Sequence, residues 1–297
     1  AGLATVFPQT IGMASSFDDQ LIEEVFTATS DEARAKYVDF IKKGSRKRYQ
    51  GLSVWTPNIN IFRDPRWGRG METYGEDPYL TSQLGMAVVR GLQGDNKDGV
   101  IKALACAKHY AIHSGPESSR HSFDAVVSER DLWETYLPAF KDLITKADVK
   151  QVMFAYNRMF GIPAGANERF MRDILEKDPT VTIISVSQND NWNYCKCEKC
   201  AATDAEEGSP AGSLIRFVNA VAEAIEPEFP KVAIDTLAYQ YSTVPPRLTR
   251  PRHNVMVRMC TGGCSSHTIE ECPRNAHTKS WIEGWERSAT ASISGIT

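Results

Sequence analysis

A lysine and a histidine stand next to each other at Lys108 and His109, directly after the apolar run IKALACA (101–107). An ammonium group beside an imidazole ring can bind polar groups of a ligand. The same two side chains at the end of a strand can also simply reach solvent. Residue types alone leave both interpretations open.

Arginine and acidic residues alternate in the Gly- and Pro-rich loop RDPRWGRGMETYGEDP (63–78), which also contains Trp67. Guanidinium groups offer fixed hydrogen-bond donors to hydroxyl groups, and an indole ring can cover the apolar face of a sugar. The alternative is a surface loop whose opposite charges pair with each other. The loop, with Arg69 near its centre, is therefore a candidate sugar-binding segment.

Six of the seven cysteines lie between residues 195 and 272. Three of them form a Cys-x-Cys-x2-Cys run: Cys195, Cys197 and Cys200. Structural zinc takes four ligands, so a residue after a later strand, Cys260, Cys264 or His267, would supply the fourth. Disulfide bonds and free thiols are the alternatives. Any metal here is expected to be structural, and Cys106, between small alanines, is expected to lie in the core.

Two aspartates are candidate reactive carboxylates in the second half of the chain. Asp190 follows the run VTIISVS (181–187), and Asp235 lies inside the run KVAIDTLA (231–238). Asp190 can alternatively cap the following loop. A buried carboxylate needs a partner, so Asp235 is either a catalytic acid at the rim of the fold or half of an ion pair in its core.

Short apolar runs rich in β-formers alternate with amphipathic segments. The predicted strands are 51–56, 101–107, 151–156, 181–187, 231–238, 254–260 and a weaker 289–296. The predicted helices are 17–43, 79–93, 129–147 and 212–226. This alternation predicts an α/β fold with a parallel sheet that is covered on both faces. Because the strands fall one short of a closed barrel, we expect a single TIM-barrel-like (β/α)8 barrel that is incomplete or irregular at its N-terminal edge.

Four polar segments begin where predicted strands end: 63–78, 108–124, 156–163 and 188–197. In a parallel barrel the carboxyl ends of the strands meet at one rim, where catalytic groups are placed. We therefore expect these segments to form one site.

Charge and hydropathy exclude two classes of partner. The 297 residues include 34 Lys and Arg against 37 Asp and Glu, so no basic surplus exists for a nucleic acid backbone. No apolar run is long enough to predict a membrane-spanning segment. The start, Ala1-Gly2-Leu3, has no initiator methionine and no signal-peptide pattern, so we expect a processed start or a fragment.

Long ordered motifs between residues 1 and 168 resemble glycoside hydrolase family 3, in its β-xylosidase and β-glucosidase branch: ATVFPQTIGMASSFD, WTPNINIFRDPRWGRGMETYGEDPYL, ACAKHYAIHSGPESSRHSFDAVVSERDLWETYLPAF and VMFAYNRMFGIPAGAN. The resemblance implies a glycoside or oligosaccharide substrate, retaining hydrolysis through two carboxyl groups, and a secreted or periplasmic bacterial protein. At matching motif positions it implies that Arg69, Lys108 and His109 hold the hydroxyl groups of the first sugar. Tyr156 would lie beside the nucleophile.

The nucleophile of that family follows a strand that reads like VVSD, and this chain departs from the pattern. The corresponding run is Ser185-Val186-Ser187-Gln188. The amide of Gln188 cannot attack an anomeric carbon and hold a glycosyl ester. Asp190 is the nearest carboxylate and is the candidate nucleophile.

The sequence from about residue 178 onward resembles a different, uncharacterised bacterial family with an α-glucuronidase-like barrel, through segments such as TIISVSQNDNWNYCKCEKC and VAIDTLAYQYSTVPP. We therefore assign 1–168 to the front part of a family 3 barrel and 169–297 to barrel units of the second family. A chimera joined near 166–180 is physically permitted, because βα units share handedness and layer packing.

The sequence thus favours an O-glycosyl hydrolase that acts on β-linked xylose or glucose at a non-reducing end. It predicts no cofactor, with a structural zinc at the cysteines as one of the alternatives above. One alternative is a sugar-binding barrel without turnover, or a hybrid without function. Another is a glycosidase for uronic acids, with Asp190 or Asp235 as its acid.

Overall fold

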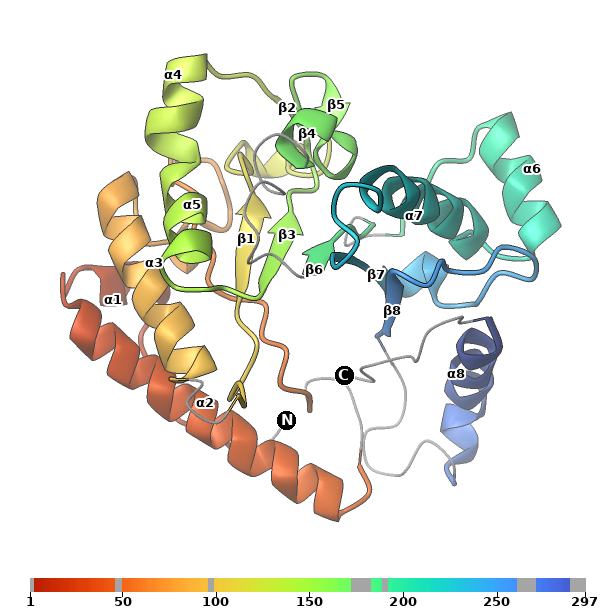
Figure 1. The fold of residues 1–297 in the computed structure, drawn as a ribbon, viewed down its shortest axis with the longest axis horizontal. Helices are drawn as coiled ribbons and strands as arrows, with labels where there is room; N and C mark the ends of the chain where they lie inside the picture. Colours follow the sequence, from red (N-terminus) through yellow and green to blue (C-terminus); the bar gives the residue numbers. More distant parts are fainter. Residues whose placement is uncertain are drawn as a thin grey trace. The chain divides into compact units, whose positions relative to one another are not determined.

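The computed structural model describes residues 3–45, 50–95, 99–171, 183–188, 192–260 and 271–288. It divides into two compact units, and each has parallel strands and helices of its own (Figure 1). The first unit comprises Ala1–Lys36 and Leu52–Ile184, and the second comprises Tyr37–Gly51 and Ser185–Thr297. The α/β class predicted from the sequence is confirmed.

The first unit is built on the parallel strands β1 (Cys106–Tyr110) and β3 (Gln151–Phe154). Nearly all of their residues are buried, which is typical of parallel strands covered on both faces. Lys108 lies opposite Met153, and the register shifts directly after Lys108. β1 therefore includes Lys108 and His109, which the sequence analysis had placed after the strand. The strand can continue because the polar groups of His109 find partners inside the protein.

The segment 51–56, predicted as a strand, has only an isolated parallel bridge between Ser53 and Leu104. A second isolated bridge joins Asn58 to Lys108. Between the two bridges lies Pro57, which has no N–H group and so cannot donate to a regular ladder. The segment therefore runs beside β1 without becoming a strand.

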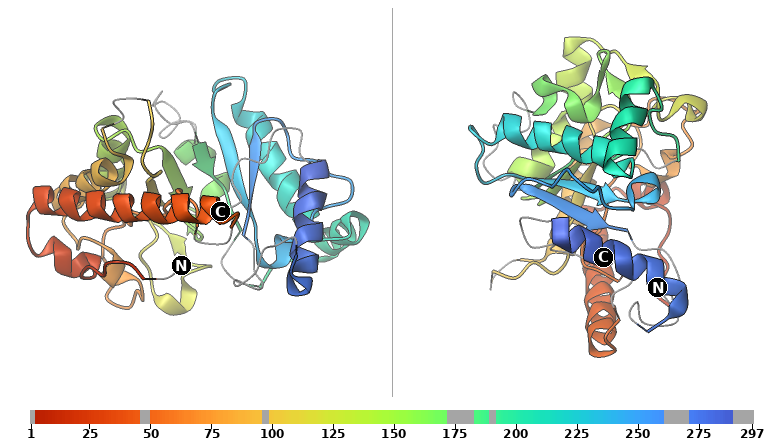
Figure 2. Two further views of the ribbon diagram at one scale, coloured as in Figure 1. Left: turned by 90° about the horizontal axis from the view of Figure 1, so that it is seen from below. Right: turned by 90° about the vertical axis from the view of Figure 1, so that its right-hand side faces the viewer.

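The longer helices that belong to the first unit wholly or in part are α1 (Thr10–Ala14), α2 (Asp19–Lys42), α3 (Pro78–Gln93) and α5 (Pro138–Thr145) (Figures 1 and 2). The last turns of α2, from Tyr37 onward, are assigned to the second unit. The carboxylate of Asp77 caps α3 by accepting the amide hydrogen of Leu80 at 2.6 Å. α3 packs against α5 through buried aliphatic side chains. A Cβ atom on Gly91 would lie 2.5 Å from the carbonyl oxygen of Glu23, so glycine allows α2 and α3 to approach closely.

The helix predicted over 129–147 is divided into three parts. A short α4 (Glu129–Asp131) continues into a π-helical turn, η3 (Leu132–Tyr136), before α5 begins at Pro138. Proline cannot donate the backbone hydrogen bond of a helix interior, and its ring clashes with the preceding turn. Pro138 is therefore accommodated as the first residue of a new helix.

Three two-residue strands form a small second sheet in the order β2 (Asp124–Ala125), β4 (Arg158–Met159) and β5 (Ile162–Pro163). Single helical turns complete the loops of the first unit: η1 (Gly70–Glu72), η2 (Glu117–Ser119) and η4 (Ala164–Ala166). The small sheet fixes the segment that follows Tyr156, because β4 pairs with both of its neighbours.

The second unit contains the parallel strands β7 (Ala233–Ala238) and β8 (Val255–Met259), paired from Ile234 with Val255 to Ala238 with Met259. A short strand, β6 (Ile183–Ser185), ends where this unit begins, and the next amide, that of Val186, donates to the carbonyl of Asp235 at 2.7 Å.

The apolar face of α7 (Ala211–Ile225) covers β7 and β8. Further helices of the second unit are α6 (Glu198–Glu207) and α8 (Ala276–Ser288), with single turns η6 (Gln240–Ser242) and η7 (Pro273–Asn275). The indole N–H of Trp285 in α8 donates to the carbonyl of Thr243 at 2.8 Å. The predicted strand 289–296 lies outside the described residues. Within the described part of the chain, no helix combines the length and apolar character that crossing a membrane requires.

Candidate functional site

The buried centre of the candidate site is His109, whose side chain and backbone are held by Asn60. The Asn60 side-chain N–H group donates to the carbonyls of His109 at 2.8 Å and Ala111 at 3.0 Å, which fixes the orientation of the amide. Asn60 Oδ1 accepts the backbone N–H of His109 at 2.9 Å and lies 3.0 Å from its Nδ1. Nδ1 therefore carries the ring proton, and Nε2 is left as an acceptor.

Arg69 uses that acceptor. Its Nη1 lies 2.9 Å from His109 Nε2, while Nε and Nη2 donate to the two carboxylate oxygens of Glu72 at 2.8 and 2.6 Å. The Arg69 side chain is only 17% exposed, so the guanidinium is held on two sides. Arg69 and His109 were both predicted as site residues, and the structure brings them into direct contact.

Lys108 lies beside this pair and is half-buried. Burial lowers the pKa of Lys108, and the charge of Arg69 lowers it further. In the described part of the chain, the ammonium group makes no hydrogen bond and no close ion pair, although the Glu72 carboxylate attracts it. Among Arg69, Lys108 and His109, Lys108 therefore supplies the cation that can pair with a ligand.

Burial keeps the imidazole rings of His109 and His113 neutral. Burial and the neighbouring His113 hold the pKa of His109 well below its usual value. Burial also lowers the pKa of His113, to about 4. For Glu72, burial acts in the opposite direction, but the hydrogen bond and the charge of Arg69 prevail and the pKa of its carboxyl is lowered. At neutral pH the site therefore holds two cations, one carboxylate and uncharged imidazoles.

An aromatic group surrounds His109. The ring of His113 lies 4.4 Å from that of His109, and the rings of Trp67 and Tyr156 lie 5.8 and 5.7 Å from His113. Tyr156 also stacks on His121 with ring centroids 5.4 Å apart. The structure thus places the predicted residue Tyr156 next to the predicted Lys108–His109 pair.

Two buried atoms of this aromatic group, Trp67 Nε1 and His113 Nε2, have no hydrogen-bond partner among the described residues. The side-chain N–H group of Asn157 donates to two carbonyls, so its Oδ1 accepts from His113 Nδ1 at 3.0 Å. His113 Nε2 is therefore an acceptor, and the indole N–H of Trp67 is a donor. Buried polar atoms normally have partners, but both atoms are sealed from solvent, so a ligand could reach them only after the surrounding side chains move.

The loops 63–78 and 108–124 are tied to each other, as their predicted common site requires. Arg63 Nε donates to the carbonyl of Ser114 at 2.8 Å, and the amide of Gly68 donates to Glu117 at 2.9 Å. The alternative of a charge-paired surface loop also describes part of the segment, because Arg66 is largely exposed and pairs with Asp64 at 2.8 Å.

Sequence reasoning did not single out Asn60, Asn157 or His113. Each is a polar residue in a largely buried stretch, at positions 58–60, 154–157 and 109–113. Such a residue must have a partner, and that requirement was the signal that could have identified them.

The second unit contains the remaining candidate carboxylates. Asp235 is 1% exposed, accepts from Ser185 Oγ at 3.0 Å and pairs with Arg258 Nε at 3.3 Å. Burial raises the pKa of its carboxyl. This geometry matches the ion-pair alternative for Asp235. Asp190, the candidate nucleophile, lies outside the described residues.

Gln188, at the position where the resemblance predicts a nucleophilic aspartate, is buried and bound through its amide nitrogen. Nε2 donates to the carbonyl of Tyr239 and to Ser242 Oγ, both at 2.8 Å. Its Oε1 is buried without a partner among the described residues. The carbonyl of Tyr239 can only accept a hydrogen bond, so it suits the amide of Gln188 and would repel a carboxylate at this position.

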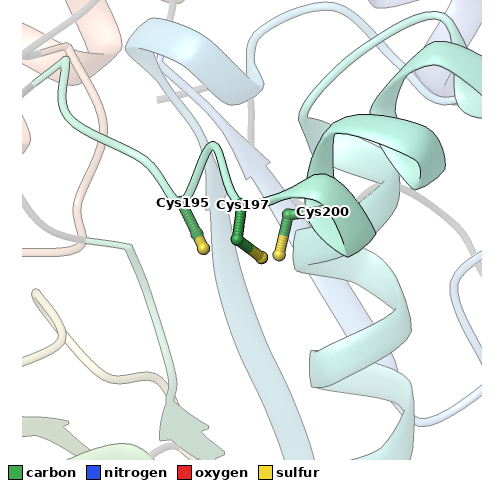
Figure 3. A group of neighbouring side chains, drawn as sticks. All are labelled: Cys195, Cys197 and Cys200. Atoms are coloured by element: carbon green, nitrogen blue, oxygen red, sulfur yellow. The ribbon is translucent and has the colours of Figure 1, made fainter.

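Three of the four predicted metal ligands gather at the start of α6. The thiol sulfur atoms of Cys195, Cys197 and Cys200 all lie within 4.8 Å of one another (Figure 3). Cys260 is described and is not a member of this group, and the alternative fourth ligands at 264 and 267 lie outside the described residues. The backbone amide of Cys200, together with hydrogen bonds between the thiols, lowers the pKa of Cys197 to about 7.

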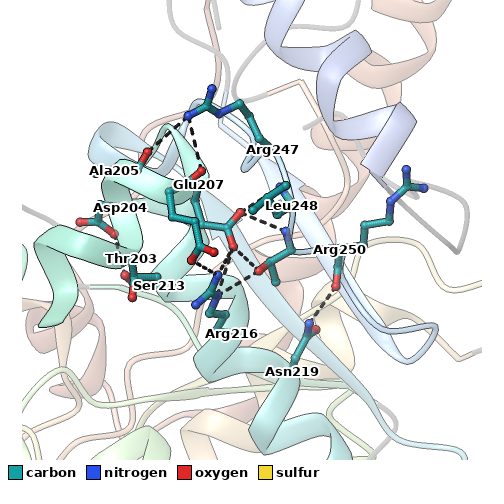
Figure 4. A network of polar contacts seen from close by, with 12 residues as sticks. Thr203, Asp204, Ala205, Glu207, Ser213, Arg216, Asn219, Arg247, Leu248 and Arg250 are labelled. Carbon is teal, nitrogen blue, oxygen red and sulfur yellow. Dashed lines mark hydrogen bonds and ion pairs between the residues drawn. The ribbon is translucent and has the colours of Figure 1, made fainter.

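Another charged group in the second unit surrounds Glu207 (Figure 4). Its buried carboxylate pairs with Arg216 at 2.6 Å, accepts the amide hydrogens of Leu248 and Thr249, both at 3.0 Å, and accepts the hydroxyl of Thr249. Burial opposes ionisation, but these hydrogen bonds prevail and lower the pKa of the carboxyl to about 2. Its oxygens are fully occupied, so the group holds a loop in place.

Two families match the chain. Residues 1–188 match the family described as glycosyl hydrolase family 3 N terminal domain, and residues 118–292 match a domain of unknown function, DUF4838. The resemblance to family 3 predicted from the sequence is confirmed, and a match to a second family in the later part of the chain is consistent with the predicted chimera.

Curated relatives with similar sequences are β-xylosidases. The chain is 52% identical over 180 residues to a xylan 1,4-beta-xylosidase of Xylanibacter ruminicola, covering 60% of this chain and 21% of that protein. It is 41% identical over 177 residues to beta-xylosidase/alpha-L-arabinofuranosidase 1 of Medicago sativa, covering 58% and 22%. The chain thus spans about a fifth of the length of these relatives.

Solved structures that resemble the chain include a β-xylosidase and a β-glucosidase. A GH3 exo-beta-xylosidase in complex with a xylobiose aziridine probe aligns with a TM-score of 0.54 and 36% identity, covering 61% of this chain and 23% of the other. A beta-glucosidase from Listeria innocua in complex with glucose aligns with a TM-score of 0.52 and 33% identity, covering 62% and 24%. For this part of the chain, the likeness confirms the predicted TIM-barrel-like α/β fold.

Proposed function

Because residues 1–188 belong to glycosyl hydrolase family 3 and residues 118–292 to a domain family of unknown function, we propose that the first unit binds a β-linked xylosyl or glucosyl residue at the non-reducing end of a glycoside, and that the protein hydrolyses this bond. The sugar would lie against Lys108, Arg69 and the aromatic group around His113. The relatives with similar sequences, named as β-xylosidases, favour xylosides over glucosides.

The observation that carries the proposal is the set of polar groups without partners beside a rigid, charged centre. The Lys108 ammonium, Trp67 Nε1 and His113 Nε2 have no hydrogen-bond partner among the described residues. Trp67 Nε1 and His113 Nε2 are sealed from solvent, so the Lys108 ammonium is the group of the three that a sugar hydroxyl can reach in this conformation. Hydrogen bonds to a charged group add about 1.5–3 kcal/mol each, so Lys108 should contribute most to binding.

His109 has a different role in this proposal. Both of its ring nitrogens are engaged, one with Asn60 and the other with Arg69. We therefore assign to His109 the positioning of Arg69, whose guanidinium would otherwise be held only by Glu72. Because the ring is neutral, its Nε2 can accept a hydrogen bond from Arg69 instead of repelling it.

Hydrolysis with retention requires a carboxylate that attacks the anomeric carbon while a second carboxyl group protonates the leaving oxygen. Glu72 is committed to Arg69, and the amide of Gln188 cannot form the glycosyl ester. We therefore assign the nucleophile to Asp190, the next carboxylate along the chain.

The test separates binding from turnover. Binding of xylose and glucose is measured by calorimetry, and turnover with chromogenic β-xylosides and β-glucosides. Lys108→Met should weaken binding by about 10- to 100-fold, whereas Lys141→Met, an exposed lysine on α5, should leave it unchanged. Asp190→Asn should abolish turnover and preserve binding.

Unchanged sugar binding in the Lys108→Met protein would contradict the proposed subsite. Full turnover in the Asp190→Asn protein would contradict the assignment of the nucleophile. Saturable binding with no turnover in the unaltered chain would reject hydrolysis and leave a sugar-binding protein.

A further inference from the structure

The thiol group formed by Cys195, Cys197 and Cys200 lies in the second unit, and neither the sugar site nor either family match explains it. We propose that these three side chains bind one zinc ion as thiolates, with a water molecule as the fourth ligand. The inference is independent of the proposed glycosidase function, because no residue of the thiol group belongs to the sugar site.

The geometry is close to what the ion requires. Zinc bonds to thiolate sulfur at about 2.3 Å, so two sulfurs on a tetrahedral ion lie about 3.8 Å apart. The three sulfur atoms already lie within 4.8 Å of one another (Figure 3). Cys195 and Cys197 are exposed and Cys200 is half-exposed, so small side-chain rotations can close the remaining distance without disturbing a packed core.

The local fold explains why the sulfurs converge. Cys197 is the residue directly before α6, and Cys200 is in the first turn of that helix. Residues three apart lie on the same side of a helix start, and Cys195 reaches the same side from the extended segment before it. Three cysteines from a stretch of six residues therefore form one donor set without help from a distant strand.

The charges at the thiol group favour binding of a cation, and the N-terminus of α6 stabilises the resulting zinc–thiolate complex. Three thiolates this close repel one another strongly, and a divalent ion between them removes the repulsion. The complex would carry two positive and three negative charges. Its net negative charge lies at the N-terminus of α6, where the helix dipole stabilises anions. Lys196 and Lys199 flank the same position in the sequence.

The alternative use of a Cys-x2-Cys pair is a disulfide bond. A disulfide would join two of the sulfurs and leave the third without a function, although all three converge. Thiolate ligands select soft or borderline cations such as zinc over magnesium or calcium. The chemical class of the ligand is therefore a thiophilic divalent cation.

Cys260, which the sequence analysis offered as a fourth ligand, is not a member of the thiol group. The proposal therefore assigns the affinity to the three cysteines at the start of α6. Replacing Cys260 should leave zinc binding unchanged.

The experiment uses the whole chain, purified without a polyhistidine tag and reduced with a non-chelating phosphine. Zinc affinity is measured by competition with a chromophoric chelator, and cobalt is added in parallel to obtain thiolate charge-transfer absorption. We expect one zinc per chain. Removing a group that only orients a metal ligand lowers metal affinity by about 10- to 100-fold. Removing a ligand itself should cost more, so Cys197→Ser and Cys200→Ser should each weaken zinc binding by more than about 100-fold.

Cys260→Ser and Cys272→Ser are the matched controls and should bind zinc like the unaltered chain. Thermal unfolding without metal shows whether each variant folds. The proposal is overturned if the triple Cys195→Ser, Cys197→Ser, Cys200→Ser variant binds zinc as tightly as the reduced chain. It is equally overturned if cobalt gives no thiolate charge-transfer band, or if the chain reoxidises to a disulfide between these cysteines while excess zinc is present.

Discussion

Replacing Asn60 with alanine tests the internal support of the sugar site. The Asn60 side chain is 1% exposed and makes four contacts with the backbone or ring of the β1 segment. Its loss leaves two donors of His109 and two carbonyls, those of His109 and Ala111, without their partner. Among the described residues, no other side chain binds both the backbone N–H and the carbonyl of His109.

The expected destabilisation follows from those four groups. A buried polar group left without its partner costs about 1–3 kcal/mol. Because water can enter the space left by the amide, we take the lower end and expect the free energy of unfolding to fall by about 4 kcal/mol. For a unit of this size, 1 kcal/mol shifts the melting temperature by about 2–4 °C. The Asn60→Ala protein should therefore melt about 8–16 °C lower.

The assay is urea unfolding followed by circular dichroism, with thermal unfolding as a second measurement. Asn219→Ala is the control, because Asn219 also accepts a backbone N–H and donates to a carbonyl, at 3.0 and 2.8 Å, but is only partly buried. We expect it to cost about 1 kcal/mol. An Asn60→Ala protein no less stable than the Asn219→Ala protein would refute the proposed support of His109.

Two further changes follow from groups described above. The folded protein keeps His113 and His109 neutral. Between pH 6.5 and about 4 the unfolded chain therefore binds more protons than the folded protein, and the free energy of unfolding falls as the pH falls. His113 alone should lower the free energy of unfolding by about 2 kcal/mol between pH 7 and pH 5, and urea unfolding curves that coincide at the two pH values would contradict its low pKa. Gly91→Ala should destabilise the protein by about 1–3 kcal/mol, because the new Cβ would meet the carbonyl of Glu23 at 2.5 Å. Gly12→Ala, whose Cβ would meet its nearest neighbour at 4.0 Å, is the control in the same melting experiment, and equal melting temperatures for the two variants would show that the α2–α3 contact is not tight.

The predictable parts of the fold are those with a strong periodic pattern. The helix predicted over 212–226 is observed as α7 over Ala211–Ile225, because one continuous apolar face covers β7 and β8. α6 was not predicted, since its sequence is dominated by charged and small residues. α8 does have an apolar side, formed by Trp281, Ile282 and Trp285, which the sequence analysis did not identify. The division at Pro138 could have been predicted from the proline itself.

For the site, residue types predicted which side chains gather, but not how they are held. Arg69, Lys108 and Tyr156 meet around His109 as expected. The fixed tautomer of His109 depends on Asn60, which is 49 residues away in the sequence. A single sequence gives no sign of which polar side chain satisfies another at that distance, because either could equally bind water.

The contacts of Glu207 also determine when one loop of the second unit can open. The amides of Leu248 and Thr249 belong to no sheet, yet both donate to a buried carboxylate at the end of α6. Their hydrogens can exchange with solvent only when the corner between α6 and α7 separates from the loop. In amide hydrogen exchange this loop should therefore be protected together with the two helices, and a protease should cut it only as fast as that corner opens.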